Sequence, residues 1–148
     1  MKQIIYKIRA QILISFVDWT KPVYAALFKN HIRGWVYSRT DLLRMPVDSL
    51  GFRLGEFLTK HKYDLIPKME EHDVMHVLMG YKTTVEDEVK MQFFLIGNRK
   101  KSVYAFITVI AGCLLIPEFY EEYIQEFKKG RKCHNCLLYT SPSPRDRG

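Results

Sequence analysis

Cysteine and long apolar runs are both scarce in this sequence. Three cysteines occur in 148 residues, and a small odd number does not make a disulfide scaffold and is typical of a reducing, intracellular compartment. The longest apolar run, residues 103–116, falls short of the roughly 20 residues that a membrane-spanning helix needs. No clear signal peptide is predicted either, because Gln11 and Ser15 interrupt the apolar N-terminus.

Basic residues outnumber acidic ones, and the formal net charge is +7. They are scattered along the chain, with no basic recognition helix or base-reading module, so we predict no nucleic-acid partner. The apolar fraction of 47% is ordinary for a globular protein and too high for a disordered one. The length is that of one domain.

The last thirteen residues, 136–148, differ in character from the rest. They read CLLYTSPSPRDRG, which resembles one translated frame of a sequencing adaptor. The stretch has no apolar periodicity and cannot build a core. We therefore expect one helical domain over residues 1–135, truncated at its C-terminus, and a non-native, disordered tail over residues 136–148.

Apolar residues recur at helical spacing, and no segment alternates with period two for long enough to make a strand. The predicted fold is an all-α, compact multi-helix domain. Its predicted helices are an N-terminal one that ends or has a joint at Lys21-Pro22, one starting at Asp48-Ser49, and those over residues 67–79, 84–96, 103–115 and 117–130. Residues 103–115 are apolar nearly all round, which predicts a central helix.

The N-terminal segment places Ile4, Ile8, Ile12 and Phe16 four residues apart, on one face of a helix. Such a face usually packs on a protein core, which is the interpretation we favour. The nearby basic residues leave a second interpretation open, in which the helix lies on a membrane surface as a peripheral contact.

The sequence His72-Asp73-Val74-Met75-His76 carries the strongest chemical signal. At about 100° per residue, His76 stands about 40° from His72 on a helix, and Asp73 about 60° from His76 on the other side. Two imidazoles at i and i+4 can chelate a divalent metal. Glu88 follows His76 after eleven residues, and a short connection would bring it back beside the histidines.

Two histidines and carboxylate oxygens suit Zn²⁺, and also Fe²⁺ or Mn²⁺. Two histidines four apart also arise by chance, so spacing alone leaves a metal site and a solvated surface equally open. The zincin pattern HExxH is absent because Asp73 follows the first histidine. Its glutamate-as-base mechanism therefore does not transfer to this chain.

Residues 72–88 match HDxxH, eleven residues, then Glu, which resembles the signature of the ubiquinone (coenzyme Q) biosynthesis family of the Coq-four type. Residues 43–51 resemble another stretch of that family, and Gly80 matches the glycine after its histidines. The resemblance covers roughly residues 42–117. It implies a helical fold and a divalent metal, usually zinc, on His72, Asp73, His76 and Glu88.

The resemblance also implies a function. It points to loss of the carboxylate at carbon 1 of a polyprenylated hydroxybenzoate ring, by simple or oxidative decarboxylation. The expected partners are an isoprenoid quinone precursor and other quinone-biosynthesis proteins, in the cytoplasm or peripherally on the inner membrane, with self-association left open. Candidate walls for the isoprenoid chain are Val74, Met75, Met79, Phe93, Phe94 and Phe106.

Two rival functions remain at this stage. The chain could be a non-catalytic lipid-binding scaffold that organises quinone-biosynthesis enzymes around a structural metal, since a closed four-ligand site serves structure and an open one serves catalysis. A metal-dependent hydrolase would need a nucleophile and a base, and the sequence shows no such constellation.

Overall fold

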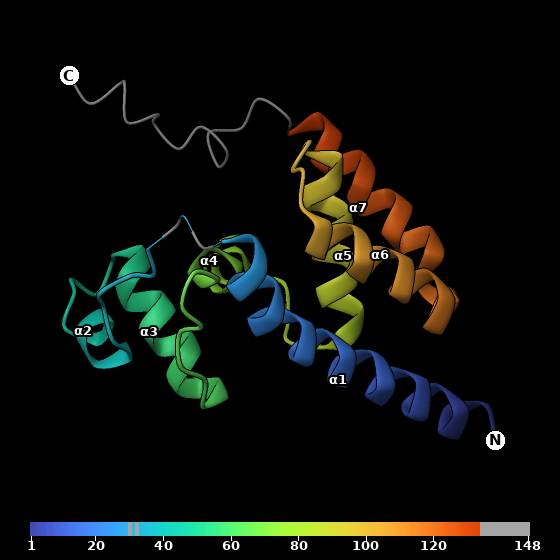
Figure 1. The fold of residues 1–148 in the computed structure, drawn as a ribbon, viewed down its shortest axis with the longest axis horizontal. Coiled ribbons are helices and arrows are strands. Elements are labelled where there is room, and N and C mark those ends of the chain that lie inside the picture. The colour runs from blue at the N-terminus through green and yellow to red at the C-terminus, as the bar shows by residue number, and fades with distance from the viewer. Residues whose placement is uncertain (30, 32, 134–148) are drawn as a thin grey trace. The chain divides into compact units, whose positions relative to one another are not determined.

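The computed structural model describes residues 1–29, 31 and 33–133. These residues form helices and contain no strand, which confirms the predicted all-α fold (Figure 1). The elements are α1 (Lys2–Phe28), α2 (Arg39–Leu43), α3 (Leu50–His61), α4 (Glu70–Met79), α5 (Val85–Gly97), α6 (Val103–Leu115), the 3₁₀ helix η1 (Pro117–Phe119) and α7 (Tyr120–Lys132). The predicted non-native tail, residues 136–148, lies outside the described residues.

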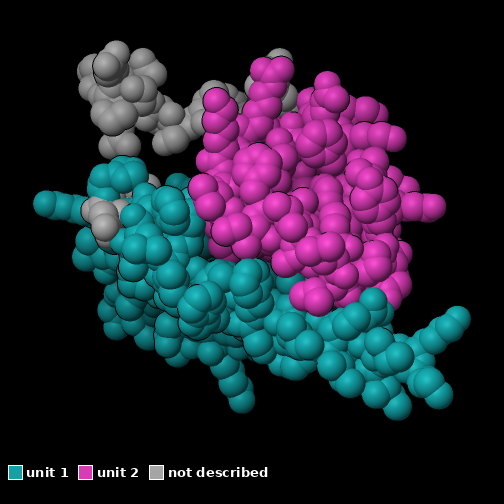
Figure 2. Space-filling model, turned by 45° about the vertical axis from the view of Figure 1, so that its right-hand side comes forward, with its two compact units in different colours: residues 1–88 teal, residues 89–148 magenta. Residues whose placement is uncertain are grey.

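The chain divides into two compact units (Figure 2), residues 1–88 and residues 89–148. The boundary falls inside α5, after its first turn. The single domain over residues 1–135 stays a prediction.

In the described part of the chain, no single helix combines the length and the apolar character needed to cross a membrane. Taken together, α6 and the segment Pro117–Lys132 reach that composition, but they are bent by 103°.

Helix α1 runs through the position where the sequence predicted its end. Pro22 lies inside the helix, six residues before its last residue, Phe28. A proline removes one backbone hydrogen bond and commonly kinks or ends a helix. The helix therefore does not end at Lys21-Pro22, whereas a joint at this position stays a prediction. The extra turns carry a buried alanine, Ala25.

The apolar stripe predicted to pack on the core faces solvent instead. Ile4, Ile8 and Ile12 are 64%, 56% and 54% exposed, whereas Leu13 and Val17 are almost fully buried. Helix α1 carries apolar residues on two sides, and period alone does not tell which side packs. The interpretation that this stripe packs on the protein core is therefore wrong. Contact of the helix with a membrane stays a prediction.

Unit 1 is built around leucines from two short helices. Leu42 of α2 packs with Leu54 and Leu58 of α3, and Val74 and Val77 of α4 cover this cluster. The helices begin at side-chain caps: the Ser38 hydroxyl accepts from the Asp41 amide, and the Ser49 hydroxyl accepts from the Phe52 amide. These caps fix the start of α2 and α3 at polar residues that the sequence marks out.

A glycine lets α2 and α3 approach closely. A Cβ at Gly55 would lie 3.1 Å from atoms of both Leu42 and Leu43. A Cβ at Gly51 would likewise meet the Met45 side chain in the turn after α2.

Helix α4, which carries both histidines, starts later than predicted. It begins at Glu70 and not at Pro67, because Lys68 adopts a left-handed backbone with φ of 69°. Its end is as predicted: Gly80 has φ of 71°, and its amide donates to the His76 carbonyl at 3.0 Å. A left-handed glycine turns the chain at once, which brings α5 back beside α4.

Unit 2 packs the rest of α5 against α7 at two glycines. A Cβ at Gly97 would collide with the Phe127 carbonyl oxygen, and one at Gly130 with the Phe94 carbonyl oxygen. Phe93 also stacks on Tyr123, with ring centroids 5.0 Å apart. The prediction that α7 ends at Gly130 is wrong, because that glycine serves this close contact inside the helix.

Helix α6 is not buried all round. Tyr104, Ala105, Thr108 and Gly112 are buried, whereas Phe106, Ile110 and Leu114 are 49%, 59% and 75% exposed. The prediction of a central helix is wrong for the described chain, since α6 buries its small and polar residues and leaves its large apolar ones outside.

Candidate metal centre

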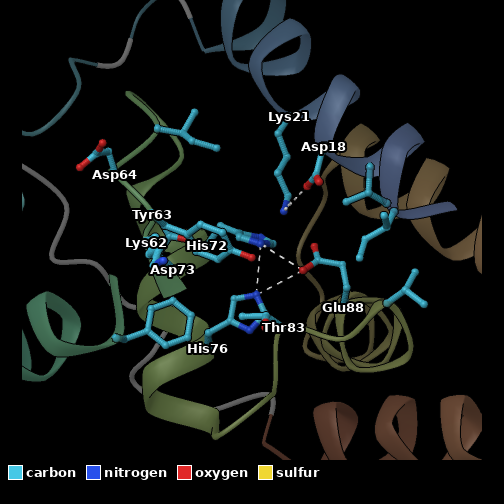
Figure 3. Close-up of a pocket in the computed structure, with 15 residues that line it drawn as sticks. Asp18, Lys21, Lys62, Tyr63, Asp64, His72, Asp73, His76, Thr83 and Glu88 are labelled. Atoms are coloured by element: carbon cyan, nitrogen blue, oxygen red, sulfur yellow. Dashed lines mark hydrogen bonds and ion pairs between the residues drawn. The ribbon is translucent and has the colours of Figure 1, made fainter. Parts of the chain in front are cut away.

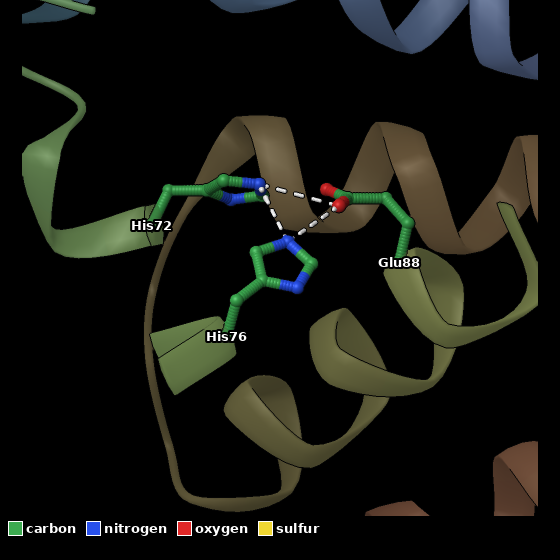
Figure 4. Close-up of side chains that lie close together, drawn as sticks. All are labelled: His72, His76 and Glu88. Atoms are coloured by element: carbon green, nitrogen blue, oxygen red, sulfur yellow. Dashed lines mark hydrogen bonds and ion pairs between the residues drawn. The ribbon is translucent and has the colours of Figure 1, made fainter. Parts of the chain in front are cut away.

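The two histidines are placed by α4 and the glutamate by the first turn of α5. The connection between these helices is tied by hydrogen bonds: the Asp87 amide donates to the Thr84 hydroxyl at 3.4 Å, and the Lys82 amide donates to the Asp87 carboxylate at 2.9 Å. The Thr84 hydroxyl thus caps the start of α5. It starts α5 so that Glu88 faces α4 (Figure 4).

The three side chains form a nearly equilateral triangle of ligand atoms (Figure 4). Glu88 Oε2 lies 3.2 Å from His72 Nε2 and 3.2 Å from His76 Nε2, and the two Nε2 atoms are 3.3 Å apart. Ligand atoms bound to one zinc at about 2.0–2.1 Å with tetrahedral angles are about 3.3 Å apart. The triangle therefore fits three neighbouring positions around one metal ion.

Each member of the triangle is removed from water. His72, His76 and Glu88 are 9%, 5% and 6% exposed. A buried ionised carboxylate is costly unless charge or hydrogen bonds balance it. Here both imidazoles face the same carboxylate oxygen, so these three residues could hold a metal ion.

A backbone carbonyl orients His76. Its Nδ1 lies 3.0 Å from the Tyr81 carbonyl oxygen, which can only accept, so Nδ1 carries the proton in this hydrogen bond. The Nε2 lone pair is then free to bind a metal, as in many metal sites where the second ring nitrogen donates outward. Phe57 of α3 also stacks on the His76 ring, with centroids 5.7 Å apart.

Burial and charge act in opposite directions on these groups. Burial would raise the pKa of Glu88, but the charge of His72 and hydrogen bonds from both histidines hold that pKa well below its usual value. Burial would lower the pKa of His76, yet the hydrogen bond and charge of Glu88 raise it overall. Glu88 is therefore ionised, as a metal ligand must be.

The triangle opens onto a cavity of about 340 Å³ (Figure 3). Its lining residues all belong to unit 1: Ile14, Val17, Asp18, Lys21, Phe57, Lys62, Tyr63, Asp64, Ile66, His72, Asp73, His76, Thr83, Val85 and Glu88. The lining combines apolar side chains with polar and charged ones. Such a cavity suits a small ligand with one charged end.

Asp73 lines the same cavity but stands apart from the triangle (Figure 3). Burial raises the pKa of its carboxyl group, against the charge of His72 and Lys21, which lowers it. Of the four residues predicted from the sequence, the structure brings His72, His76 and Glu88 together, and it places Asp73 on the cavity wall beside them.

The apolar wall differs from the predicted one. None of the six residues proposed from the sequence lines this cavity. Val74 lines a separate apolar cavity of about 350 Å³ beside Trp35 and Leu54, and Phe93 and Phe94 are buried in unit 2. Val74 lies on the side of α4 opposite the two histidines, and Phe106 lies on α6, which carries none of the three metal-binding residues.

Sequence reasoning missed three contributors to the site. Lys21 reaches the cavity from α1, Phe57 from α3, and the Tyr81 carbonyl from the connection before α5. A helical spacing of four between Val17, Lys21 and Ala25 was the available signal for Lys21, since the two apolar neighbours are buried. The Tyr81 contact is made by backbone, for which the sequence carries no signal.

A comparison with curated proteins finds a protein of similar sequence. The chain is similar to a ubiquinone biosynthesis protein. That relative is the mitochondrial ubiquinone biosynthesis protein COQ4 homolog of Cryptosporidium parvum (strain Iowa II), which is 32% identical over 105 residues. The match covers 58% of this chain and 33% of the relative, so the matched part spans about a third of the relative's length. No family model matches the chain.

The COQ4 homolog supports the resemblance of this chain to that family. It is named as a mitochondrial protein of ubiquinone biosynthesis. The triangle of His72, His76 and Glu88 is a feature of the structure itself and does not depend on this likeness.

Proposed function

We propose that this chain is part of a COQ4-type protein that binds one divalent metal ion and acts in ubiquinone biosynthesis. The ligands are His72, His76 and Glu88, and Asp73 is either a fourth ligand or a neighbour that orients one. Zinc suits two imidazoles and a carboxylate best, and Fe²⁺ or Mn²⁺ suit them too. The observation that carries the proposal is the buried triangle with 3.2–3.3 Å edges facing a cavity.

The proposed substrate is a polyprenylated hydroxybenzoate, which loses its carboxylate at carbon 1. In the simple reaction the bond between carbon 1 and the carboxylate breaks, CO₂ leaves and a proton from solvent takes its place, and a bound divalent ion would supply Lewis acidity for the negative charge that develops. Replacement by hydroxyl would also need a two-electron oxidant that supplies the oxygen atom, such as O₂, and a redox-active ion. The support for this substrate class is the likeness to the COQ4 homolog and the shape of the cavity. Other quinone-biosynthesis proteins are the proposed partners.

The residues of the chain have distinct tasks in this proposal. Val17, Phe57 and Ile66 provide apolar wall for the aromatic ring. Tyr81 fixes the tautomer of His76 through its carbonyl, and Glu88 stays ionised because both histidines face it. Burial of the triangle excludes bulk water, so the charges inside act through a low local dielectric.

An open metal position favours catalysis over a purely structural metal. Structural zinc sites are closed by four protein ligands, and catalytic ones keep a position for water or substrate. The triangle supplies three ligands and borders the cavity. For this reason we place the enzyme proposal ahead of the lipid-binding scaffold.

The test is release of labelled CO₂ from a prenylated 4-hydroxybenzoate carrying ¹³C in its carboxyl group. We expect metal-loaded protein to release ¹³CO₂ and a His76→Ala variant to release none above background. A metal-loaded, folded protein that binds the substrate but leaves its carboxylate intact would contradict the enzymatic function and favour the scaffold.

A further inference from the structure

Lys21 lies on the packed face of α1, where lysine is unusual. Val17 and Ala25, four residues before and after it, are 1% and 5% exposed. The Lys21 side chain itself is 15% exposed. A lysine held between two buried residues cannot extend freely into solvent, so its ammonium group is directed by the helix (Figure 3).

The ammonium group faces the cavity that the metal-binding triangle borders (Figure 3). Asp73 and Glu88 line the same cavity as Lys21, so the positive charge of Lys21 acts on a space that carboxylates border. Its ion pair with Asp18 is 3.6 Å long, and the Asp18 side chain is 68% exposed. Water screens the exposed Asp18 carboxylate, so this ion pair leaves the Lys21 ammonium group available to a ligand in the cavity that both residues line.

The charges that border the cavity indicate that an anionic ligand would need a cation such as Lys21. A divalent ion on the triangle carries two positive charges, and the Glu88 and Asp73 carboxylates offset them. Two further carboxylates, those of Asp18 and Asp64, also line the cavity. An anionic ligand entering next to the metal then needs a further cation. Among the described residues that line the cavity, the lysines are Lys21 and the exposed Lys62.

We infer that Lys21 binds the carboxylate of the ligand and holds it beside the metal-binding triangle. The ligand class is an aromatic carboxylate whose ring lies against the apolar wall formed by Val17, Phe57 and Ile66. This inference rests on the proposed function for the choice of ligand, and Lys21 is a binding residue that the sequence analysis did not identify. A charge-assisted hydrogen bond from an ammonium to a carboxylate is short and strong.

The experiment measures binding of 3-geranyl-4-hydroxybenzoate and of its neutral methyl ester to the full chain by titration calorimetry. Both are measured with zinc and with a chelator present. The variants are Lys21→Gln, which removes the charge, Lys21→Arg, which keeps it, and Lys62→Gln, which makes the same charge change at the exposed side of the cavity. Metal content and melting temperature are recorded for each variant.

We expect Lys21→Gln to weaken binding of the carboxylate about tenfold and to leave binding of the ester within twofold of wild type. Lys21→Arg should keep most of the affinity, and Lys62→Gln should change it little. The difference between the two ligands should persist in the metal-free protein, because Lys21 acts directly on the carboxylate.

Three results would overturn the inference. Wild-type protein could fail to bind the carboxylate more tightly than the ester. Lys21→Gln could weaken both ligands equally or lose its metal, which would make Lys21 a structural counter-ion. Lys62→Gln could weaken the carboxylate as much as Lys21→Gln. Loss of the proposed decarboxylation with Lys21-dependent binding intact would instead contradict the function and leave this inference standing.

Discussion

At the scale of single residues, the site depends on how the imidazoles of His72 and His76 face one carboxylate oxygen of Glu88. His72 and His76 could be predicted as a pair from their spacing, and Glu88 from the resemblance that residues 72–88 carry. The exact triangle could not, because it depends on the left-handed Gly80 and on hydrogen bonds within the connection after it. For Lys21 the sequence offers only its spacing of four from Val17 and Ala25, which does not show that this side of α1 lies beside the histidines.

Removing the charge of Glu88 should weaken metal binding strongly. In Glu88→Gln the amide oxygen is a poorer ligand than a carboxylate, and we expect affinity for zinc to fall by roughly 100-fold or more. Competition with a chromophoric chelator measures it. The matched control is Glu86→Gln, two residues earlier on the same helix, which should bind zinc like wild type. Equal affinities for Glu88→Gln and wild type would contradict the ligand role.

The variant Asp73→Asn tests whether Asp73 binds the metal or only lies beside the three ligands. The side chain lies outside the triangle, so we expect the variant to keep near-normal metal content after dialysis, unlike His76→Ala. Elemental analysis of both variants measures this. Complete loss of metal in Asp73→Asn would instead make Asp73 a ligand, as the family resemblance implies.

The metal-free protein should show a stability maximum on the acid side of neutrality. The lowered pKa of Glu88 gives stability that is present above about pH 4.5, its ordinary value, and is lost as the pH falls through the lowered pKa. The raised pKa of His76 gives stability that is present below about pH 6.5 and is lost as the pH rises through the raised pKa.

Urea unfolding with a chelator present, from pH 4 to pH 9, tests this dependence. We expect the stability difference between wild type and His76→Ala to shrink as the pH rises from 6 to 9. A difference that stays constant or grows over that range would show that His76 is not preferentially protonated in the folded, metal-free protein.

At the scale of elements, helix existence could be predicted and helix faces could not. Caps at Ser49 and Ser102 and the left-handed Gly80 fix helix ends through local chemistry. Both α1 and α6 carry apolar residues on more than one side, so periodicity did not tell which residues are buried. Glycines were ambiguous for the same reason: Gly80 turns the chain, whereas Gly130 makes room for a neighbouring helix.

Two glycine-to-alanine variants test whether the glycines serve close contact. In Gly130→Ala the new Cβ meets the backbone carbonyl of Phe94, which cannot move cheaply, so we expect a loss of about 1–3 kcal/mol in the free energy of unfolding. In Gly51→Ala the Cβ meets the tip of Met45, which can turn away, while alanine gains about 1 kcal/mol of helix propensity.

Urea unfolding of both variants is the measurement. The account predicts that Gly51→Ala is neutral or stabilised and that Gly130→Ala is clearly destabilised. Equal effects of the two substitutions would show that the contact between α5 and α7 is looser than the structure has it.

At the scale of the whole molecule, the metal-binding residues and the cavity all lie in unit 1. A ligand that binds the folded state stabilises it by about 2.7 kcal/mol at 100 times its Kd. We expect zinc to slow amide hydrogen exchange in α4 and in the first turn of α5, and to have less effect in α6 and α7. Uniform slowing would show that both units unfold together, and no slowing in α4 would argue against the site.

The most direct test of the central claim is the metal content of the purified protein. Elemental analysis should find close to one equivalent of a divalent transition metal in wild type, and far less in His72→Ala, His76→Ala and Glu88→Ala. Glu86→Gln should keep the wild-type content. A folded wild-type protein that contains no metal, and takes up none from added zinc, iron or manganese, would contradict the metal-centred account of this chain.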